Sequence, residues 1–332
     1  MLQRTPTFPE IPLIEVGPAF PMATLEAALP RAQALLDAAT HGVPPHVLAG
    51  LDKVSRSWLA RNNNAHLFEI DAIAAKLARP GAYFLSVNYE WGCTCRVAPS
   101  PDGTSARLVR VLDWLTPGLG RNVMAAKVAS PPGSFVTLTW PGYTGVLQAV
   151  AKGRFAAALN QAPMRKAGGG LMPLDWAINK GRVWRMRTGT PAHLLRDVFE
   201  QATNYAQARR MLIDTPIASP AIFSLAGLAP GETCVIERTE TAAHVHDGPG
   251  VAANNWQAAG WKGRPRGENS AGRACRMAAV EPAFDPSLPW LEAPILNART
   301  RLVMVADASS GRFMAQGFEQ DGPATAVLEA NA

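Results

Sequence analysis

The sequence predicts an α+β protein in which helices pack against antiparallel sheets. Three observations support this class. Apolar residues recur at helical spacing from residue 23 to about residue 75, short β-rich runs between turn residues follow from residue 82, and residues 191–216 form a helical pair that stands between two blocks of strands. Helices that stand between blocks of strands suggest separate layers of helix and sheet.

The first 80 residues are expected to be mostly helical. An extended arm interrupted by prolines covers residues 1–20. Proline, glycine and asparagine clusters mark the starts and stops of the helices that follow. We expect three of them, at residues 24–42, 44–64 and 67–80.

The remainder of the chain is expected to hold most of the strands. Valine, isoleucine, threonine and aromatic residues form short runs bounded by Pro, Gly, Asp and Ser, a composition typical of strands. We expect strands within residues 82–91, 93–98, 106–114, 134–145, 221–228, 232–240 and 242–247, a helix within 268–280, and a hairpin at 300–318 that turns at Ser309–Gly311.

The composition describes a globular chain with a sizeable core, because 48% of the 332 residues are hydrophobic and 17% are charged. The net charge of +6 is scattered without a Lys/Arg block, so no nucleic-acid partner is expected.

No apolar run reaches the roughly 18–20 residues of a membrane helix, and no secretory signal is recognised. Four cysteines are too few for a disulfide framework. These features predict a cytoplasmic protein.

Cys93 and Cys95 stand one residue apart in the run GCTCRVA. Four interpretations are open: a redox pair, two metal ligands, two buried apolar side chains, or one nucleophile. C-x-C is not the C-x-x-C redox motif, and no βαβ unit surrounds it. The other two cysteines, Cys234 and Cys275, stand singly and suit small buried side chains.

His244 and His246 form the pair of residues most like metal ligands, because H-x-H on a strand points both rings to one face. They precede a Gly-Pro-Gly turn, which favours a polar turn over a metal site. No metal or other cofactor is expected.

A cysteine nucleophile needs a base, and the six histidines fall in no recognisable partner motif. An N-terminal residue carries its own base, since its α-amine titrates near pH ~8. Using it requires the chain to be cut immediately before the cysteine. The Gly92–Cys93 bond suits such a cut, because glycine leaves the scissile carbonyl open and tolerates unusual backbone angles.

From about Leu85 onward the chain resembles the N-terminal-nucleophile amide hydrolases of the choloylglycine hydrolase class, above all the acid ceramidase and N-acylethanolamine acid amidase branch. CTCRVA resembles the nucleophile motif of that branch, and RVLD, 17 residues after Cys93, keeps the Arg–Asp spacing of its Gly-Arg-Asn-x-Asp motif. Further similar segments follow in order: GYTG, AALNQAP, TPIASPAIFSLAGL with CVIERT, VAANNWQ, SAGRACR and NARTRLVMV, the last with Asn297 and Thr300.

The resemblance implies an αββα sandwich, two antiparallel sheets between helical layers. It implies a mostly helical propeptide or α-subunit over residues 1–92 and a catalytic β-subunit over residues 93–332, separated by autocatalytic cleavage between Gly92 and Cys93. The catalytic residues it implies are Cys93, Arg110, Asp113, Asn160, Asn255 and Arg273, with Asn254 and Arg276 as competitors for the last two roles.

The resemblance also implies hydrolysis of N-acyl amides with a hydrophobic, lipid-like acyl group. Cys93 forms the acyl-enzyme, Arg110 favours its thiolate, Asp113 orients the amine, and Asn160 and Asn255 stabilise the oxyanion. Four aromatic residues are expected to bind substrate, although a simple core suits them equally: Trp114, Trp140, Tyr143 and Trp256. The cleaved N-terminal fragment is expected to stay bound as a subunit, and a homo-oligomer is left open.

Two other functional classes stay open. One is a different acyl-transfer enzyme on the same fold, such as a penicillin or acyl-homoserine lactone acylase or a bile-salt hydrolase. The other is a non-catalytic or redox protein in which Cys93 and Cys95 form a labile disulfide. Cys95 replaces a serine of the family motif and so competes with Cys93 as nucleophile, but Gly92 before and Thr94 after Cys93 favour Cys93.

Overall fold

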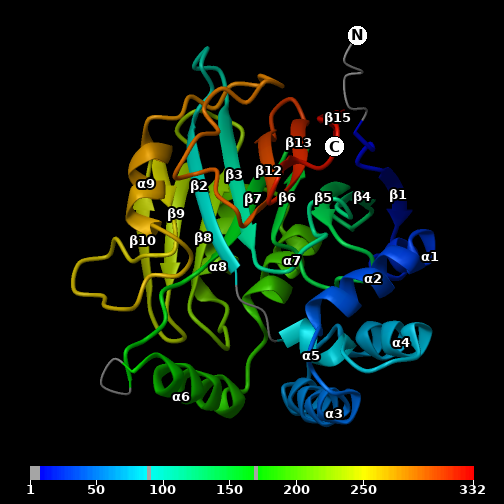
Figure 1. Ribbon diagram of the computed structural model, residues 1–332. Helices are drawn as coiled ribbons and strands as arrows, with labels where there is room; N and C mark the ends of the chain where they lie inside the picture. Colours follow the sequence, from blue (N-terminus) through cyan, green and yellow to red (C-terminus); the bar gives the residue numbers. More distant parts are fainter. Residues whose placement is uncertain (1–7, 88–90, 168–170) are drawn as a thin grey trace.

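The computed structural model describes residues 8–87, 91–167 and 171–332, and these parts form two stacked sheets with helices on both outer faces (Figure 1). The first sheet has the order β1-β4-β5-β6-β7-β8-β9-β10, and the second has the order β11-β2-β3-β12-β13-β14, with β15 beside β13. Only β1 and β4 pair in parallel among the described strands. This layering agrees with the predicted αββα sandwich.

The N-terminal region contains the three predicted helices, the first of them in two pieces. The elements are β1 (Leu13–Gly17), α1 (Met22–Ala27), α2 (Leu29–Ala39), α3 (Pro45–Arg61) and α4 (Leu67–Leu77). The first helix is interrupted at Ala28, whose φ of −146° is not helical, and α2 restarts there because Pro30 fits the first turn of a helix. Part of the predicted arm forms β1, and residues 1–7 of that arm lie outside the described residues.

The strand predicted within residues 82–91 is wrong over most of its length, because Ala82–Val87 form the helix α5. The aromatic and β-branched residues there favoured a strand. Asp52 of α3 overrides this preference, since its carboxylate accepts hydrogen bonds from Gly81 N (2.7 Å) and Phe84 N (2.8 Å) in the first turn of α5. Residues 88–90 of the same predicted run lie outside the described residues.

The other predicted strands and helices are present, with additional elements between them. The remaining elements are β2 (Trp91–Pro99), β3 (Ala106–Trp114), β4 (Met124–Val128), β5 (Phe135–Thr139), β6 (Gln148–Ala151), β7 (Phe155–Gln161), α6 (Met172–Arg185), α7 (Pro191–Gln201), α8 (Tyr205–Asp214), β8 (Ala221–Ala226), β9 (Thr233–Arg238), β10 (Ala243–Asp247), β11 (Gly250–Ala252), α9 (Ser270–Ala278), β12 (Thr300–Asp307), β13 (Arg312–Glu319), β14 (Gly322–Pro323) and β15 (Leu328–Asn331). The predicted hairpin turns at Gly311, whose φ of +80° suits glycine.

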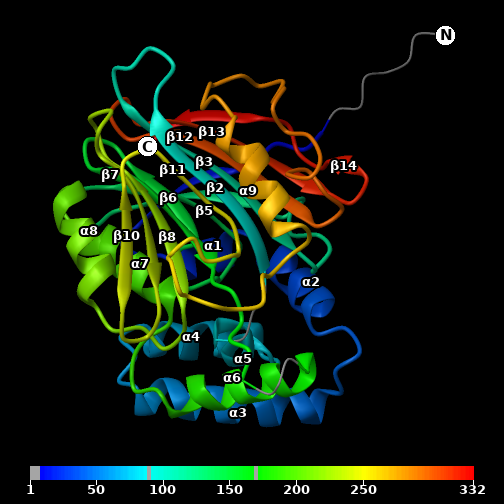
Figure 2. The ribbon, with the colours of Figure 1, turned by 90° about the vertical axis from the view of Figure 1, so that its left-hand side faces the viewer.

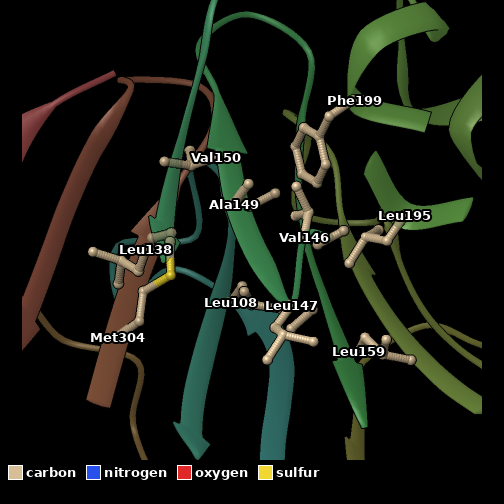
Figure 3. Close-up of a cluster of buried hydrophobic side chains, with 14 of the residues drawn as sticks. Leu108, Leu138, Val146, Leu147, Ala149, Val150, Leu159, Leu195, Phe199 and Met304 are labelled. Carbon is tan, nitrogen blue, oxygen red and sulfur yellow. The ribbon is translucent and has the colours of Figure 1, made fainter. Parts of the chain in front are cut away.

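The main core lies between the two sheets and continues under the helices that cover the first sheet (Figure 3). Leu108 of β3 and Met304 of β12 face the strands of the first sheet, including Leu138 of β5. On the opposite face of the first sheet, Leu195 and Phe199 of α7 complete the packing. All five side chains are buried. A smaller core under α9 covers the outer face of the second sheet.

The long helix α6 lies apart from the sheets, beside the N-terminal helices at one end of the molecule (Figure 2). Trp58 Nε1 and Asn62 Nδ2, at the end of α3, donate hydrogen bonds to Val183 O of α6 (3.0 Å) and to Thr188 O (3.3 Å) beyond it. Helices from the two sides of the predicted cleavage site are therefore in direct contact. No helix within residues 8–87, 91–167 and 171–332 is long and apolar enough to cross a bilayer.

Candidate active site

Strands β2 and β3, which are neighbours in the second sheet (Figure 1), carry Cys93, Arg110 and Asp113. Their pairing brings these three residues close together. In their register Gly92 pairs with Asp113, Cys93 with Leu112 and Cys95 with Arg110. Because side chains alternate along a strand, the spacing of three residues places Arg110 and Asp113 on opposite faces of the sheet. The backbone of Cys93 is consequently flanked by charged groups on both faces.

On the inner face, Arg110 contacts the candidate nucleophile directly. Its Nη2 donates to Cys93 Sγ at 2.9 Å, and its Nη1 donates to Leu159 O (2.6 Å) and Asn160 Oδ1 (2.5 Å). Cys95 Sγ donates to the same Asn160 oxygen at 3.0 Å. Arg110, Asn160 and both cysteines are completely buried. The inner face therefore fixes both thiols around one guanidinium and one amide.

Asn160, the predicted oxyanion donor, lies beside Arg110, but its amide nitrogen is already engaged. Nδ2 donates to Ala252 O (3.1 Å) and Ala253 O (3.3 Å), while Oδ1 accepts from Arg110 and Cys95. The only hydrogen-bond donor of this side chain is that amide nitrogen. Asn160 can stabilise an oxyanion at Cys93 only after its amide leaves those two carbonyls.

On the outer face, Arg273 of α9 holds the two residues that follow the candidate bond. Its Nη1 donates to Cys93 O (2.7 Å) and Thr94 Oγ1 (2.6 Å), and its Nη2 donates to Asn254 Oδ1 (3.0 Å). Nη1 also lies 3.4 Å from Asp113 Oδ2. The competitor Arg276 instead pairs with Glu292 at the surface. The structure thus brings Arg273, and not Arg276, to the site.

Asp113 is anchored by the late strand β12, because Thr300 Oγ1 donates to Asp113 Oδ1 at 3.0 Å. The same hydroxyl accepts from Asn297 N at 3.1 Å. Asn297 and Thr300, singled out in the sequence, therefore support a buried carboxylate next to the scissile bond.

The structure places Asn254, rather than Asn255, at Cys93. Asn254 Oδ1 accepts a hydrogen bond from Cys93 N (2.7 Å), and its Nδ2 donates to Gln161 O (2.7 Å). Asn255 Oδ1 accepts from Ser270 Oγ instead (2.8 Å), and that hydroxyl also accepts from Asn254 N (2.8 Å). Sequence reasoning did not single out Ser270, which joins the two asparagines from the first turn of α9.

Burial shifts the pKa values of Cys93 and Asp113 in the direction that favours their neutral forms. Loss of solvent raises the pKa of the Cys93 thiol to about 12, although Arg110 acts in the opposite direction. Burial likewise raises the pKa of Asp113, against the opposing charge of Arg273. We expected Arg110 to favour the thiolate; it does, but desolvation is the larger effect. In the uncut chain Cys93 is therefore a neutral thiol.

Gly92 and Gly267 are in backbone contact at the candidate cleavage site. A Cβ atom added to Gly92 would lie 3.4 Å from the Cα of Gly267 and 3.3 Å from the Cβ of Asp113. A Cβ added to Gly267, where φ is +68°, would lie 2.7 Å from Arg273 Nη2. Only glycine at position 267 lets this segment pass over the bond while Arg273 keeps its place. Sequence reasoning missed Gly267, because no local pattern distinguishes it from an ordinary turn glycine.

Three of the four predicted substrate-binding aromatics line one cavity of about 360 Å³. Trp114, Trp140 and Tyr143 form one side of it, and apolar residues of α2, α4 and α5 form the other. The ring of Trp114 also stacks on Trp91 at 5.2 Å between centroids. Trp256 is elsewhere, packed edge-on against Trp261 at 5.0 Å. Its assignment to this set is not supported by its position.

The remaining side chains considered from sequence lie away from this site. Cys234 is buried as expected, but Cys275 is exposed, because it faces outward from the amphipathic helix α9. His244 and His246 lie in β10 with ring centroids 4.6 Å apart, and His246 Nε2 is 3.2 Å from Glu237 Oε2. Both histidines therefore lie in a strand rather than in the turn that follows it.

Comparisons with known proteins relate part of the chain to one enzyme class. No protein-family model matches the chain. The acid ceramidases of Homo sapiens and Heterocephalus glaber are 36% and 34% identical to it over 104 residues, which are 31% of this chain and 25% of either relative. The matched region therefore spans about a quarter of the length of these curated relatives.

A solved structure shares the fold over a longer stretch. It is a Caenorhabditis elegans ortholog of N-acylethanolamine-hydrolyzing acid amidase, which is 19% identical, has a TM-score of 0.50, and covers 72% of this chain and 100% of its own. The match confirms the predicted fold. Together, the sequence relation to acid ceramidases and this shared fold confirm the predicted resemblance to the N-terminal-nucleophile cysteine hydrolases.

Proposed function

We propose that the chain cuts itself between Gly92 and Cys93 and then hydrolyses N-acyl amides that carry an apolar acyl group. One observation carries the proposal: Cys93 is held at its thiol, its backbone nitrogen and its carbonyl oxygen, and the first two of these atoms react in the cut. Arg110 binds Sγ, Asn254 binds the backbone nitrogen and Arg273 binds the carbonyl oxygen. The attacking sulfur and the departing nitrogen are thus each held by a polar side chain of another segment.

Self-cleavage begins with attack of Cys93 Sγ on the carbonyl carbon of Gly92. The C–S bond forms as the Gly92–Cys93 C–N bond breaks, and the thiol proton passes to the departing nitrogen. Water then hydrolyses the thioester and leaves Gly92 as a carboxylate. Because Asn254 Oδ1 already accepts from that nitrogen, it is placed to hold the new α-amine.

In the mature enzyme the α-amine of Cys93 replaces the missing histidine as general base. It takes the thiol proton while Sγ attacks the substrate amide, and it returns the proton to the leaving amine. Water then releases the acid from the acyl-enzyme. An oxyanion donor at this step contributes on the order of 10²–10³ in rate, and Asn160 supplies it once its amide leaves Ala252 and Ala253.

The apolar cavity of about 360 Å³ is suited to the acyl chain, because it adjoins the scissile bond through Trp114 and Leu115. The test is fatty-acid release by the cleaved protein from N-acylethanolamines of increasing chain length. We expect kcat/KM to rise with each added methylene, by up to about 0.8 kcal/mol of burial per CH₂. If the cleaved protein hydrolyses none of these amides, the proposed activity is wrong. If kcat/KM does not depend on chain length, the apolar cavity does not bind the acyl chain.

Gly267→Ala is expected to slow self-cleavage by about 10-fold or more, because the new Cβ displaces the Arg273 guanidinium from Cys93 O, and small misplacements near reacting atoms have large effects. The half-time of fragment formation measures it. Gly260→Ala is the matched control, since Gly260 has φ +80° and no atom within 4 Å of an added Cβ. Equal slowing in both variants would assign the effect to backbone strain and not to Arg273.

We further propose that the N-terminal fragment stays bound after the cut. Strand β1 from this fragment pairs with β4 of the remainder. At the α4–α7 interface, Arg196 Nη2 donates to Glu69 Oε1 at 2.8 Å, and His66 Nε2 is 2.9 Å from Asp197 Oδ1. The backbone pairing and these largely buried ionic contacts join the two fragments. None of them depends on the Gly92–Cys93 bond, so they remain after the cut.

Association of the fragments should weaken as pH rises through the pKa of His66. Burial alone would lower this pKa, but hydrogen bonds to Asp197 and Glu69 outweigh burial and raise it, against the charge of Arg196. Nearby His193 is buried, with a pKa well below its usual value, so it stays neutral. A group with a raised folded-state pKa stabilises fully below its unfolded pKa of ~6.5 and loses that contribution above its folded pKa.

The urea midpoint for fragment dissociation, measured from pH 5 to pH 9, checks this. We expect it to fall with rising pH in the wild type and to fall much less in His66→Gln. His41→Gln, at an exposed position, should follow the wild type. An unchanged slope in His66→Gln would show that another group controls the association.

A cytoplasmic location also remains a proposal. All four cysteines are unpaired thiols, as a reducing compartment favours.

A further inference from the structure

The asparagine that holds Cys93 N lies in an irregular segment, beyond the end of β11. Three partners engage its side chain: Cys93 N and Arg273 Nη2 donate to Asn254 Oδ1, and Asn254 Nδ2 donates to Gln161 O. These contacts require the Asn254 backbone to keep one position, because a hydrogen bond weakens steeply as its geometry departs from the ideal. The group that fixes this backbone therefore controls how Cys93 N is held.

Ser270, in the first turn of α9, binds that backbone directly. Its Oγ accepts from Asn254 N at 2.8 Å and donates to Asn255 Oδ1 at 2.8 Å. The second bond orients the hydroxyl, because its single proton points to Asn255 and leaves a lone pair for Asn254 N. Asn254 and Ser270 are both buried, so loss of the hydroxyl would leave a buried N–H without its acceptor, which is costly.

Helix α9 presents two residues to the same asparagine. Ser270 and Arg273 are three residues apart, a spacing that puts their side chains on one face of a helix, and both are buried. The helix packs against β2, the strand that carries Cys93. The first turn of α9 thus holds Asn254 at its backbone nitrogen through Ser270 and at its side-chain oxygen through Arg273.

We propose that Ser270 is a positioning residue, which places the Asn254 oxygen at Cys93 N and thereby tunes the base of the mature enzyme. The inference rests on the proposed amidase function, because that base is the α-amine released by the cut. An uncharged acceptor such as Asn254 Oδ1 binds an ammonium about twice as strongly as a neutral amine. Its contact therefore raises the pKa of the α-amine.

Other groups also act on this amine through their charge. Within the described part of the chain, the ionisable groups that face Cys93 from β2, β3 and α9 are Cys95, Arg110, Asp113 and Arg273. The Ser270 hydroxyl bonds to none of these four, since its partners are Asn254 N and Asn255 Oδ1. A substitution of Ser270 therefore tests the contact with Asn254 without removing a charge from the site.

The test is the pH profile of kcat/KM for the cleaved Ser270→Ala variant, with the N-acylethanolamine that the wild type hydrolyses fastest. We expect kcat to fall about 10-fold, because the base is misplaced. KM should stay close to the wild-type value, because Ser270 lines neither cavity beside the scissile bond. The base acts unprotonated, so activity rises with pH through its pKa. Weaker acceptance by Asn254 lowers that pKa, and we expect the acid limb to move down by roughly 0.5 pH unit or more.

Two further variants separate the hydroxyl from a general loss of stability. Ser270→Thr keeps the hydroxyl and should keep the wild-type profile. Ser105→Ala is the matched control, because Ser105 is buried to the same degree and its Oγ donates to Asp307 Oδ2 at 2.7 Å, beside the end of β3 opposite to Asp113. Ser105→Ala should lower the free energy of unfolding and leave kcat and the acid limb unchanged.

The outcomes separate the inference from the function. If the wild type hydrolyses acyl amides but the acid limb of Ser270→Ala is unmoved or raised, or if Ser105→Ala moves it equally, the inference is wrong while the amidase function stands. A Ser270→Ala protein that folds, by circular dichroism, but is never cut supports the inference if Ser270→Thr is cut, and contradicts it if Ser270→Thr also stays whole. If the cleaved wild type hydrolyses no acyl amide, the amidase function is wrong, and the inference about its base is wrong with it.

Discussion

Cys93→Ala is expected to remain a single 332-residue chain, whereas Cys95→Ala is expected to be cut like the wild type. Only Cys93 Sγ can form a thioester with the carbonyl directly before it while releasing its own nitrogen as an α-amine. Cys95 faces the same guanidinium, but its thiol is held by Asn160 Oδ1 at 3.0 Å, and it lies two residues beyond the bond. Intact mass under denaturing conditions distinguishes the two results.

Cys95→Ala is a matched control for Cys93→Ala, because both cysteines are completely buried in β2 and each substitution removes one sulfur atom. Misfolding would therefore affect both variants. If Cys93→Ala is cut and Cys95→Ala is not, the nucleophile is Cys95. If both are cut at the wild-type rate, cleavage comes from a contaminating protease and not from the chain.

Asn254→Ala is expected to slow self-cleavage on the order of 10²-fold, and Asn255→Ala much less. The first substitution removes the acceptor of Cys93 N, which restrains the scissile amide directly, and it also removes the partner of Arg273 Nη2. The second removes only a contact to Ser270 Oγ. The rate of fragment formation, followed over time from freshly folded protein, measures both effects.

Asn254→Asp separates the two ends of the side chain. It keeps an oxygen for Cys93 N and Arg273 but loses the Nδ2 donor to Gln161 O, so we expect cleavage faster than in Asn254→Ala. If Asn255→Ala is the slower of the two alanine variants, then Asn255 is the functional residue, and the position of Asn254 in the uncut chain is only structural.

The layered fold and the Cys93–Arg110–Asp113 arrangement could be predicted because they depend on local order along the chain. Strands β2 and β3 are neighbours in sequence and pair in a hairpin, so their register brings Arg110 opposite Cys95 and Asp113 opposite Gly92. Separation of Arg110 and Asp113 onto opposite faces also follows from strand geometry.

The features that sequence reasoning missed depend on tertiary contacts or on the course of an irregular segment, which no local pattern indicates. Helix α5 forms because Asp52, about 30 residues away, accepts hydrogen bonds from its first turn. Asn254 and Asn255 lie in the irregular segment after β11, where a shift of one residue would change which of the two side chains faces Cys93. Trp256 was grouped with the other aromatics by type, but its position depends on Trp261.

The most direct test of the central claim is the identity of the first residue in the larger wild-type fragment. The account predicts a fragment of residues 93–332 whose terminal cysteine, with a free amine and a free thiol, condenses with an aldehyde to a thiazolidine that mass spectrometry detects. A wild-type protein that remains one chain at every pH, or a fragment that begins at any residue other than Cys93, would contradict it.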